Sequence, residues 1–546
     1  MKTIKRYFAY ILIILCALMA FGLIHSPKVQ SIDSESFSAE RVASDIKIIS
    51  QNPHSFQQPF AKNQLKNYLY QRLDDMGGHP RVLEYKNIAA RQEPYIIDIA
   101  DIYAEFYPIR ADSSTYEPDS YLLLVAHYDS RFMTVVNGKE EWSLGAADDG
   151  YGLSVSLESV SQALKYRKDW KQGIKILFTD AEENHCDGVR NAIEYDNWVF
   201  DDVGLVMNLE ACGVRGPVLL FETSENNSKI IDLYKQTEYP HAYSLTSVIY
   251  SYLPYFTDYT YLKKELIPGV NFANLVNSDY YHNANDNYSN INLKTLQHYG
   301  SQTEPIIKEY LTNDKYSDSN YLKKSEESIY FSHPWGIITF KKQSWNLVNA
   351  IIFAIFCFSL VFMILSRHIR LKSLGRSILS VLLTTIIILL LGQGIGYLAH
   401  LIPASVLYVK DIIASFSVLI VLIYVMSRSK IKIRKNQDQY LKEKGFAVMI
   451  FMLVFSAIMF FTIGDDFIFI FTVGITALAL FLYLFVYLNS LSLVALLIIE
   501  WIACIVLFDT YHALTIVDLG IILVMVYYYI ILISVLFRCY MYQKRN

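Results

Sequence analysis

Cysteine is scarce in this sequence, with six in 546 residues. A small disulfide-stabilised fold needs a far denser cysteine pattern, so a disulfide scaffold is excluded. Cys16, Cys357 and Cys504 lie in apolar runs, where cysteine behaves as a small hydrophobic residue. Cys186 and Cys212 lie in the polar part of the chain. An oxidising compartment would allow them to form a bridge, and two free thiols are the alternative.

Charge is also limited, at 18% of the residues, and neither sign dominates: 48 lysines and arginines stand against 52 aspartates and glutamates. The chain therefore lacks the basic surface that nucleic-acid binding requires, and we expect no nucleic-acid partner. Hydrophobic residues, by contrast, make up 53% of the chain. This fraction is high for a soluble protein and predicts that part of the chain lies in a lipid bilayer.

The first segment, MKTIKRYFAYILIILCALMAFGLI at 1–24, joins a basic start to a long apolar run. A cleaved signal peptide and an uncleaved signal anchor both begin in this way. The length of the run and the lack of a small-residue cleavage site after it favour the anchor. We expect a cytoplasmic start and a transmembrane anchor over 1–29.

The polar part of the chain alternates predicted strands and helices. Apolar strand-like runs lie at 95–107, 120–127, 173–180, 203–211 and 268–275, and amphipathic helices are predicted at 36–51, 62–77 and 151–166. Alternation of this kind predicts an α/β domain over 30–315, with a mostly parallel central sheet flanked by helices. A strand-rich connector is expected over 316–344.

Seven apolar stretches follow, each about the 20 residues that cross a hydrocarbon core. They lie near 345–365, 378–400, 407–426, 446–463, 467–487, 490–508 and 516–537. We therefore expect a polytopic α-helical membrane domain over 345–546. Glu500 lies inside one of these spans, where an ionised group is costly and often functional, although it could also pair with a neighbouring helix.

Positive charges predict the orientation of these spans. The basic segments 1–6, 366–376, 427–444 and 538–546 all fall on one side of the membrane if one anchor and seven spans alternate. Because basic loops stay in the cytoplasm, both termini should be cytoplasmic. The α/β domain should then lie on the cell surface or in a lumen.

Potential metal ligands stand where the predicted strands end. They are His127, Asp148 in the turn GAADDG, Glu182 and Glu183 in DAEE, Glu210 in NLEACG and His282 in DYYHNANDN. Taken singly, these residues are typical of a structural histidine, a helix N-cap turn and a solvated acidic turn. Taken together, they place ligands at the carboxyl ends of strands, where α/β proteins bind their ligands. Two histidines and three carboxylates suit a pair of zinc ions, with a spare carboxylate as general base.

The motifs HYDS, GAADDG, DAEE, NLEACG and YYHNAND, in this order, resemble those of the zinc metallopeptidase family of the di-zinc aminopeptidases, which also includes glutamate carboxypeptidase. The resemblance implies that two zinc ions are held per chain. His127 and Glu210 would hold one of them. Glu183 and His282 would hold the other, and Asp148 would bridge the two.

The same resemblance assigns further roles. Glu182 would be the general base, and Asp129 the partner of the first histidine. Asp149 would follow a cis peptide bond. Tyr281 would hydrogen-bond the oxyanion, although ordinary packing is the alternative for a tyrosine that follows Tyr280. Two departures from the family pattern, Tyr151 and the segment NHCDG at 184–188, make the shape of the pocket less predictable than the metal site.

The arrangement of anchor, peptidase-like domain and spans resembles the branch of vacuolar membrane proteases and endoplasmic reticulum metallopeptidases. It implies a membrane-anchored exopeptidase, with an aminopeptidase favoured, that hydrolyses peptides by a water between two zinc ions. A single-zinc glutaminyl cyclase is the nearest alternative, but the second aspartate of GAADDG favours the hydrolase. A non-catalytic receptor or scaffold, or transport by the spans, are alternatives of other classes. The sequence makes no prediction of oligomeric state.

Overall fold

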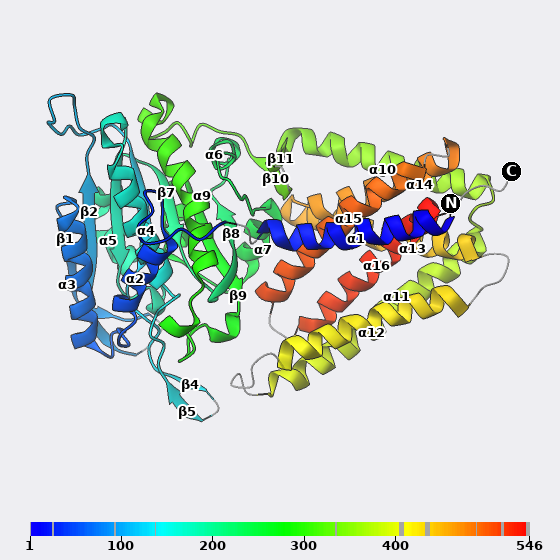
Figure 1. The fold of residues 1–546 in the computed structure, drawn as a ribbon, viewed down its shortest axis with the longest axis horizontal. Coiled ribbons are helices and arrows are strands. Elements are labelled where there is room, and N and C mark those ends of the chain that lie inside the picture. Colours follow the sequence, from blue (N-terminus) through cyan, green and yellow to red (C-terminus); the bar gives the residue numbers. More distant parts are fainter. Residues whose placement is uncertain are drawn as a thin grey trace. The chain divides into compact units, whose positions relative to one another are not determined.

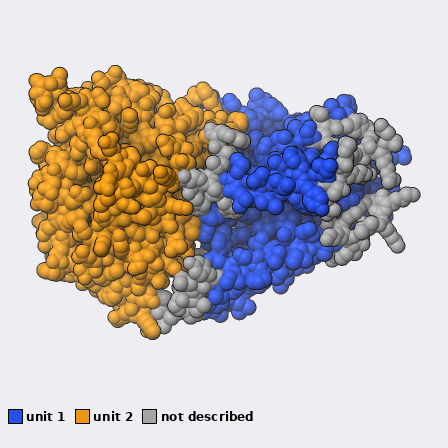
Figure 2. Space-filling model, viewed as in Figure 1, with its two compact units in different colours: residues 1–23, 343–546 blue, residues 24–342 orange. Residues whose placement is uncertain are grey.

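The computed structural model describes residues 2–24, 27–91, 94–136, 138–333, 336–402, 409–431, 437–486, 489–514 and 518–541. The chain divides into two compact units (Figure 2). We call Ile24–Lys342 the α/β unit, and Met1–Leu23 together with Gln343–Asn546 the helical unit. Each unit is described by itself.

A seven-stranded sheet forms the centre of the described α/β unit (Figure 1). Its strands are β1 (Arg81–Ala89), β2 (Ile96–Phe106), β3 (Tyr121–His127), β6 (Gly173–Thr179), β7 (Val203–Leu209), β8 (Arg215–Thr223) and β9 (Gly269–Val276). Their order is β1-β2-β6-β3-β7-β9-β8. The inner strands β6, β3, β7 and β9 pair in parallel, whereas β1, β2 and β8 join by antiparallel pairs. The predicted parallel sheet is thus confirmed at its centre, and the sheet as a whole is mixed.

Helices cover both faces of this sheet. One face packs against α2 (Ala39–Ile49), α3 (Pro59–Asp75), α4 (Gly150–Leu164) and α9 (Leu293–Thr312), and the other against α5 (Asp187–Tyr195) and α8 (Asp258–Lys264). Every residue of β3, β6 and β7 is buried, as continuous apolar runs require when both faces are covered. The α/β class is therefore confirmed.

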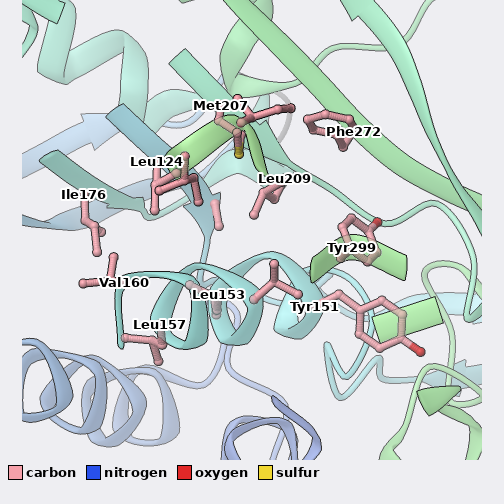
Figure 3. Close-up of a cluster of buried hydrophobic side chains, with 14 of the residues drawn as sticks. Leu124, Tyr151, Leu153, Leu157, Val160, Ile176, Met207, Leu209, Phe272 and Tyr299 are labelled. Atoms are coloured by element: carbon pink, nitrogen blue, oxygen red, sulfur yellow. The ribbon is translucent and has the colours of Figure 1, made fainter. Parts of the chain in front are cut away.

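The side chains between α4 and the sheet form the larger core of this unit (Figure 3). Val160 of α4 points toward Ile176 of β6. The same cluster of fully buried side chains includes Leu124, Leu153, Leu157 and Met207. Each such side chain contributes about 1.5–3 kcal/mol by leaving water. This packing holds α4, and with it the turn that precedes it, against the carboxyl ends of the strands.

Smaller elements complete the unit. They are the hairpin β4 (Thr134–Val136) and β5 (Lys139–Glu141), the helices α6 (Ser228–Tyr234) and α7 (Ser244–Tyr252), the hairpin β10 (Ser328–His333) and β11 (Gly336–Lys341), and the 3-10 turns η1 (Arg167–Asp169), η2 (Glu182–Asn184), η3 (Asn197–Phe200), η4 (Ser278–Tyr280), η5 (Tyr288–Asn290) and η6 (Asp314–Ser317). The backbone of Ser328 donates a hydrogen bond to Asn227 Oδ1 at 2.9 Å. The segment expected as a connector therefore packs on the α/β unit.

The helical unit consists of long apolar helices. They are α1 (Lys2–Ile24), α10 (Lys342–Leu365), α11 (Leu371–His400), α12 (Val409–Ile431), α13 (Gln437–Ile463), α14 (Phe467–Phe485), α15 (Asn489–Ala513) and α16 (Leu519–Met541). Within the described residues, the seven from α10 to α16 are long and apolar enough to cross a membrane, whereas the apolar part of α1, Tyr7–Ala20, is shorter. Large hydrophobic side chains such as Leu390 and Phe461 are exposed, at 67% and 84%. Such surfaces suit lipid rather than water, which agrees with the predicted polytopic membrane domain.

Glu500 lies in the middle of α15 and is buried, with 8% of its surface exposed. Its Oε2 atom has no hydrogen-bond partner among the residues that the structure describes. The structure assigns this carboxyl no role, so the functional reading of Glu500 stays a prediction.

Candidate active site

The inner strands bring the predicted site residues to one edge of the sheet. Parallel strands end at the same edge, so residues that are distant in sequence meet there. The residues concerned are His127 at the end of β3, Asp148 in the turn before α4, Glu182 and Glu183 in η2 after β6, Glu210 directly after β7, and His282 after β9 and η4. The parallel pairing thus places the ends of β3, β6, β7 and β9 next to one another.

Two groups of three side chains share Asp148. His127, Asp148 and Glu210 form one group, Asp148, Glu183 and His282 form the other, and the donor atoms of each group lie within 4.8 Å of one another. Asp148 Oδ1 is 3.2 Å from His127 Nε2, and Asp148 Oδ2 is 3.3 Å from His282 Nε2. Glu210 Oε2 is 3.7 Å from His127 Nε2, and Glu183 Oε1 is 3.1 Å from His282 Nε2. Asp148 therefore turns one oxygen toward each group, as a bridging ligand does.

The second group contains three buried atoms that the described protein leaves without a hydrogen-bond partner. They are Asp148 Oδ2, Glu183 Oε1 and His282 Nε2. Buried polar atoms in folded proteins are almost always paired, because an unpaired one keeps its full desolvation cost. Three such atoms that converge on one point fit a cation. Imidazole nitrogens with carboxylate oxygens are donors that zinc accepts.

Electrostatics point the same way. Burial alone would lower the pKa of His282, but Glu183 and Asp148 outweigh it and raise this pKa to about 9. Burial likewise opposes the carboxylates around His127, and these still raise its pKa well above the ordinary value. Burial, only partly opposed by His127, raises the pKa of Glu210 to about 8. The cluster therefore concentrates negative charge that draws in positive charge, as protons or as metal.

Glu182 lies beside the two groups and belongs to neither. Burial, followed by the negative charges of Glu210 and Asp258, raises its pKa well above the ordinary value. The thiol of Cys186 donates a hydrogen bond to Glu182 Oε1 at 3.4 Å. A carboxylate whose pKa is raised is suited to accept a proton and to release it again.

Asp129 contacts the site through both its backbone carbonyl and its side-chain carboxylate. Its backbone carbonyl lies 2.9 Å from His127 Nδ1, and its carboxylate oxygen is further away, at 3.5 Å. The carboxylate instead accepts the backbone N–H groups of Glu182 and Glu183, at 3.0 and 3.3 Å. We expected this carboxylate to take the ring proton of His127. In the structure the peptide carbonyl is the better placed acceptor, and the carboxylate holds the turn of the two glutamates.

The turn GAADDG contains a cis peptide bond between Asp148 and Asp149, at the position that the family resemblance predicts. Asp149 also caps α4, because its Oδ1 accepts the backbone N–H of Gly152 at 2.9 Å. Its Oδ2 accepts the backbone N–H of His127 at 3.3 Å. The N-cap reading and the site reading of this turn are therefore compatible.

The tyrosines of the last motif differ in their surroundings. Tyr280 is buried, at 8% exposure, whereas Tyr281 is only partly buried and stacks on the His282 ring, with 3.5 Å between the ring centroids. The Tyr281 hydroxyl makes no hydrogen bond within the described residues, so it is available to a substrate. Tyr151 lies in the core of the unit (Figure 3), where its hydroxyl donates to the carbonyl of Val214 at 2.8 Å. The tyrosine that departs from the family pattern is therefore a packed and hydrogen-bonded core residue.

Cys186 and Cys212 are free thiols in the structure. The bridge considered from the sequence is not formed, and the alternative of two thiols holds. Burial raises the pKa of both thiols, that of Cys212 to about 12. Neither is therefore a reactive thiolate at neutral pH.

Sequence reasoning missed several residues that contact the site. Asp286 accepts the backbone N–H groups of Ala147 and Asp148, at 2.7 and 3.3 Å, and so ties the GAADDG turn to the His282 loop. Its place in the motif YYHNAND was the available signal. Asn208 donates to Glu210 Oε1 at 3.0 Å, and Arg131 pairs with Glu183. Arg131 directly follows the motif HYDS, but nothing in its spacing marks it as part of the site.

The family model described as Peptidase family M28 matches residues 109–306. This segment starts before β3 and ends in α9, so it contains both groups of donor residues. The chain contains a peptidase family M28 domain. Metallopeptidases of this family use zinc, which agrees with the cluster of histidines and carboxylates.

Curated relatives extend beyond the M28 domain. A vacuolar membrane protease of Candida dubliniensis is 27% identical over 384 residues, which cover 66% of this chain and 38% of that protein. Endoplasmic reticulum metallopeptidase 1 of Mus musculus is 24% identical over 355 residues, which cover 61% of this chain and 38% of that protein. The chain thus spans well under half the length of these relatives.

Solved structures with a similar fold include exopeptidases and glutaminyl cyclases. The glutaminyl cyclase of Porphyromonas gingivalis is 20% identical and covers 51% of this chain and 100% of that chain, with a TM-score of 0.41. At this level of similarity no choice between the two activities follows.

Proposed function

We propose that the M28 domain is a di-zinc exopeptidase, with aminopeptidase activity favoured, that acts on peptides. The observation that carries the proposal is the division of the Asp148 carboxylate between two donor groups, with one oxygen toward His127 and the other toward His282. His127 and Glu210 would hold one zinc ion, and Glu183 and His282 the other. Asp148 would bridge the two ions.

The residues around these donors suit hydrolysis of an amide. Two zinc ions held there would polarise the substrate carbonyl and lower the pKa of a water molecule. The Glu182 carboxylate would take a proton from the attacking water and return it to the leaving amine. The Tyr281 hydroxyl would donate a hydrogen bond to the developing oxyanion. Asp129 would keep Glu182 and Glu183 in their turn through their backbone N–H groups.

The decisive test replaces Glu182 by Gln in the full-length protein. We expect Glu182→Gln to retain about two zinc ions per chain and to lose peptide hydrolysis by about 10²–10⁴-fold, the usual contribution of a general base. Glu183→Gln is the matched control, because it changes a proposed ligand at the neighbouring position and should lower the zinc content. Zinc is measured by elemental analysis and turnover with aminoacyl and dipeptide substrates. Undiminished hydrolysis by Glu182→Gln would show that Glu182 is not the general base.

The same measurements separate the alternatives. One zinc per chain, with cyclisation of N-terminal glutamine and no peptide cleavage, would indicate a glutaminyl cyclase. A fully zinc-loaded protein that performs neither reaction would indicate a receptor or scaffold. A substrate gradient maintained by residues 340–546 expressed alone would reveal a transport function of the spans.

We place the M28 domain on the cell surface or in a lumen, with both termini in the cytoplasm. The basic segments at 1–6, 366–376, 427–444 and 538–546 support this orientation. The two relatives are named for the vacuolar membrane and the endoplasmic reticulum, and both names refer to membranes that enclose a lumen. Protease digestion of sealed vesicles tests the placement, because cleavage of the M28 domain from the cytoplasmic side would contradict it.

A further inference from the structure

The side chain of Arg131 contacts Glu183 of the candidate active site. Its Nη1 atom donates to Glu183 Oε2 at 3.0 Å and to the Glu183 carbonyl at 3.3 Å. Three residues further on, Thr134 Oγ1 donates to the carbonyl of His282 at 3.1 Å. The segment from Arg131 to Thr134 therefore borders both terminal donors of the second group, at the base of the β4–β5 hairpin.

The guanidinium group of Arg131 is held in a fixed plane. Its central carbon lies 3.9 Å from the centroid of the Phe132 ring, and the Phe132 ring packs on Phe56 with 5.7 Å between centroids. The side chain is 16% exposed. Stacking on an aromatic face fixes the direction of the donor fork, which a lysine in the same place would leave free.

One edge of this fork is unused by the protein. Within the described residues, neither Nε nor Nη2 has a hydrogen-bond partner, and Nε is buried. These two nitrogens form the side edge of the guanidinium group, which matches the two oxygens of a carboxylate. A buried donor without a partner in a site otherwise rich in hydrogen bonds indicates a group that arrives with a ligand.

Neutralising Glu183 does not account for this geometry. That task uses Nη1 alone, and a lysine would fulfil it equally well. The remaining donors belong to a side chain that pairs with Glu183 of the second donor group, beside which a negatively charged substrate group would be repelled without a local cation. Several arginines and lysines form ion pairs within the described residues. Of these, Arg131 is the one that pairs with a member of the two donor groups.

We propose that Arg131 is a specificity-determining residue that binds a carboxylate of the substrate through its Nε and Nη2 atoms. The inference rests on the proposed exopeptidase function. The carboxylate is either the C-terminus of a short peptide or an acidic side chain next to the cleaved bond. Recognition is bidentate and charge-assisted, so an uncharged amide in the same position loses one acceptor and the charge.

The test compares matched substrates with the zinc-loaded full-length protein. Alanyl-alanine and alanyl-alaninamide differ in the terminal carboxylate, and the amides of alanyl-glutamate and alanyl-glutamine differ in the side chain. We expect kcat/KM to favour the carboxylate member of one pair by about tenfold or more, because the arginine donors stay unpaired with the amide. The pair that shows the preference identifies the source of the carboxylate.

Arg131→Gln should remove this preference, and Arg131→Lys should retain part of it. Arg110→Gln is the matched control, because Arg110 also stacks on an aromatic ring, that of Tyr116, but lies on the exposed surface. Zinc content is measured for every variant, so that loss of metal is not mistaken for loss of recognition.

The inference fails if the wild type cleaves both members of each pair equally well. It also fails if Arg131→Gln lowers kcat/KM by the same factor for all four substrates, because Arg131 would then act through Glu183 and the metal. Cleavage without preference overturns this inference and leaves the proposed function standing. Absence of hydrolysis of any peptide by the zinc-loaded wild type overturns the proposed function.

Discussion

The carboxylate of Asp129 accepts the backbone N–H of Glu182 at 3.0 Å. Its second oxygen accepts the N–H of Glu183 at 3.3 Å, so one side chain from the loop after β3 fixes the turn after β6. Ala181, the residue before this turn, has a left-handed backbone conformation with φ of 56°, which is uncommon for a residue other than glycine. The direction in which Glu182 and Glu183 point thus depends on Asp129.

Replacement of Asp129 by Asn tests this dependence. An asparagine amide offers one oxygen to the two N–H groups and turns its own NH₂ group toward the other. We expect kcat to fall by about 10–100-fold, the usual effect of losing a partner that orients metal ligands. Zinc content and kcat are measured on the same preparations. Asp112→Asn is the matched control, because Asp112 accepts the N–H of Ser114 in an exposed loop. Equal kcat in the two variants would contradict the role of Asp129.

Tyr281→Phe tests the Tyr281 hydroxyl, which makes no hydrogen bond among the residues that the structure describes. The phenylalanine ring keeps the stacking on His282, so zinc content and KM should change little. We expect kcat to fall by about 100-fold, because one donor to the oxyanion is lost. Tyr280→Phe, at the buried neighbouring position, should leave kcat unchanged. A Tyr281→Phe variant with wild-type kcat would show that this tyrosine only packs.

We expect Glu304 to make the stability of the protein depend on pH, independently of the metal site. The residue lies on α9, and burial, together with the charge of Glu158, raises its pKa from 4.5 to about 8. Between these values the folded protein holds a proton that the unfolded chain has lost. The contribution of Glu304 to the free energy of unfolding is therefore complete below pH 4.5. It falls by about 1.4 kcal/mol per pH unit and is lost as the pH rises through 8.

Glu304→Gln removes this titration. We expect its melting temperature, relative to the wild type, to rise steadily between pH 5 and pH 8 and then to stay constant. Glu309→Gln on the same helix is the control, since Glu309 pairs with Lys315 near the surface, at 2.8 Å. Thermal unfolding of the full-length protein in detergent measures both variants. A difference from the wild type that does not vary with pH would refute the prediction.

Two glycines set the spacing of α11 and α16. A Cβ atom on Gly392 would lie 2.5 Å from Gly520 Cα, and Gln393 Oε1 accepts the Gly520 N–H at 2.8 Å at the same crossing. Gly392→Ala should therefore push the helices apart and cost about 1–3 kcal/mol, as overpacking does elsewhere. Gly394→Ala is the matched control, because a Cβ there meets no atom within 4 Å. Equal melting temperatures of the two variants would show that the helices yield without cost.

Part of this description was predictable from local patterns. Apolar runs mark five strands of the sheet, β2, β3, β6, β7 and β9, and the helix α4 follows its glycine turn as expected. The antiparallel edge strands β1 and β8 were missed. β1 is half-exposed and alternates polar with apolar residues. Edge strands carry a weaker apolar signal than strands buried on both faces.

The sequence by itself determined the family of the α/β unit, the order of its ligand motifs and the presence of seven apolar helices. These features follow from residue type and spacing along the chain, so they can be recognised before the fold is known. The tertiary structure decided which oxygen of Asp148 faces which histidine, that the Asp129 carboxylate holds Glu182, and that Cys186 and Cys212 are free thiols. It also decided that Arg131 pairs with Glu183 through Nη1, while its Nε and Nη2 have no partner within the described part of the chain. These relationships join strands through the parallel pairing of the sheet, and their distances of a few ångströms depend on packing that no spacing in the sequence records.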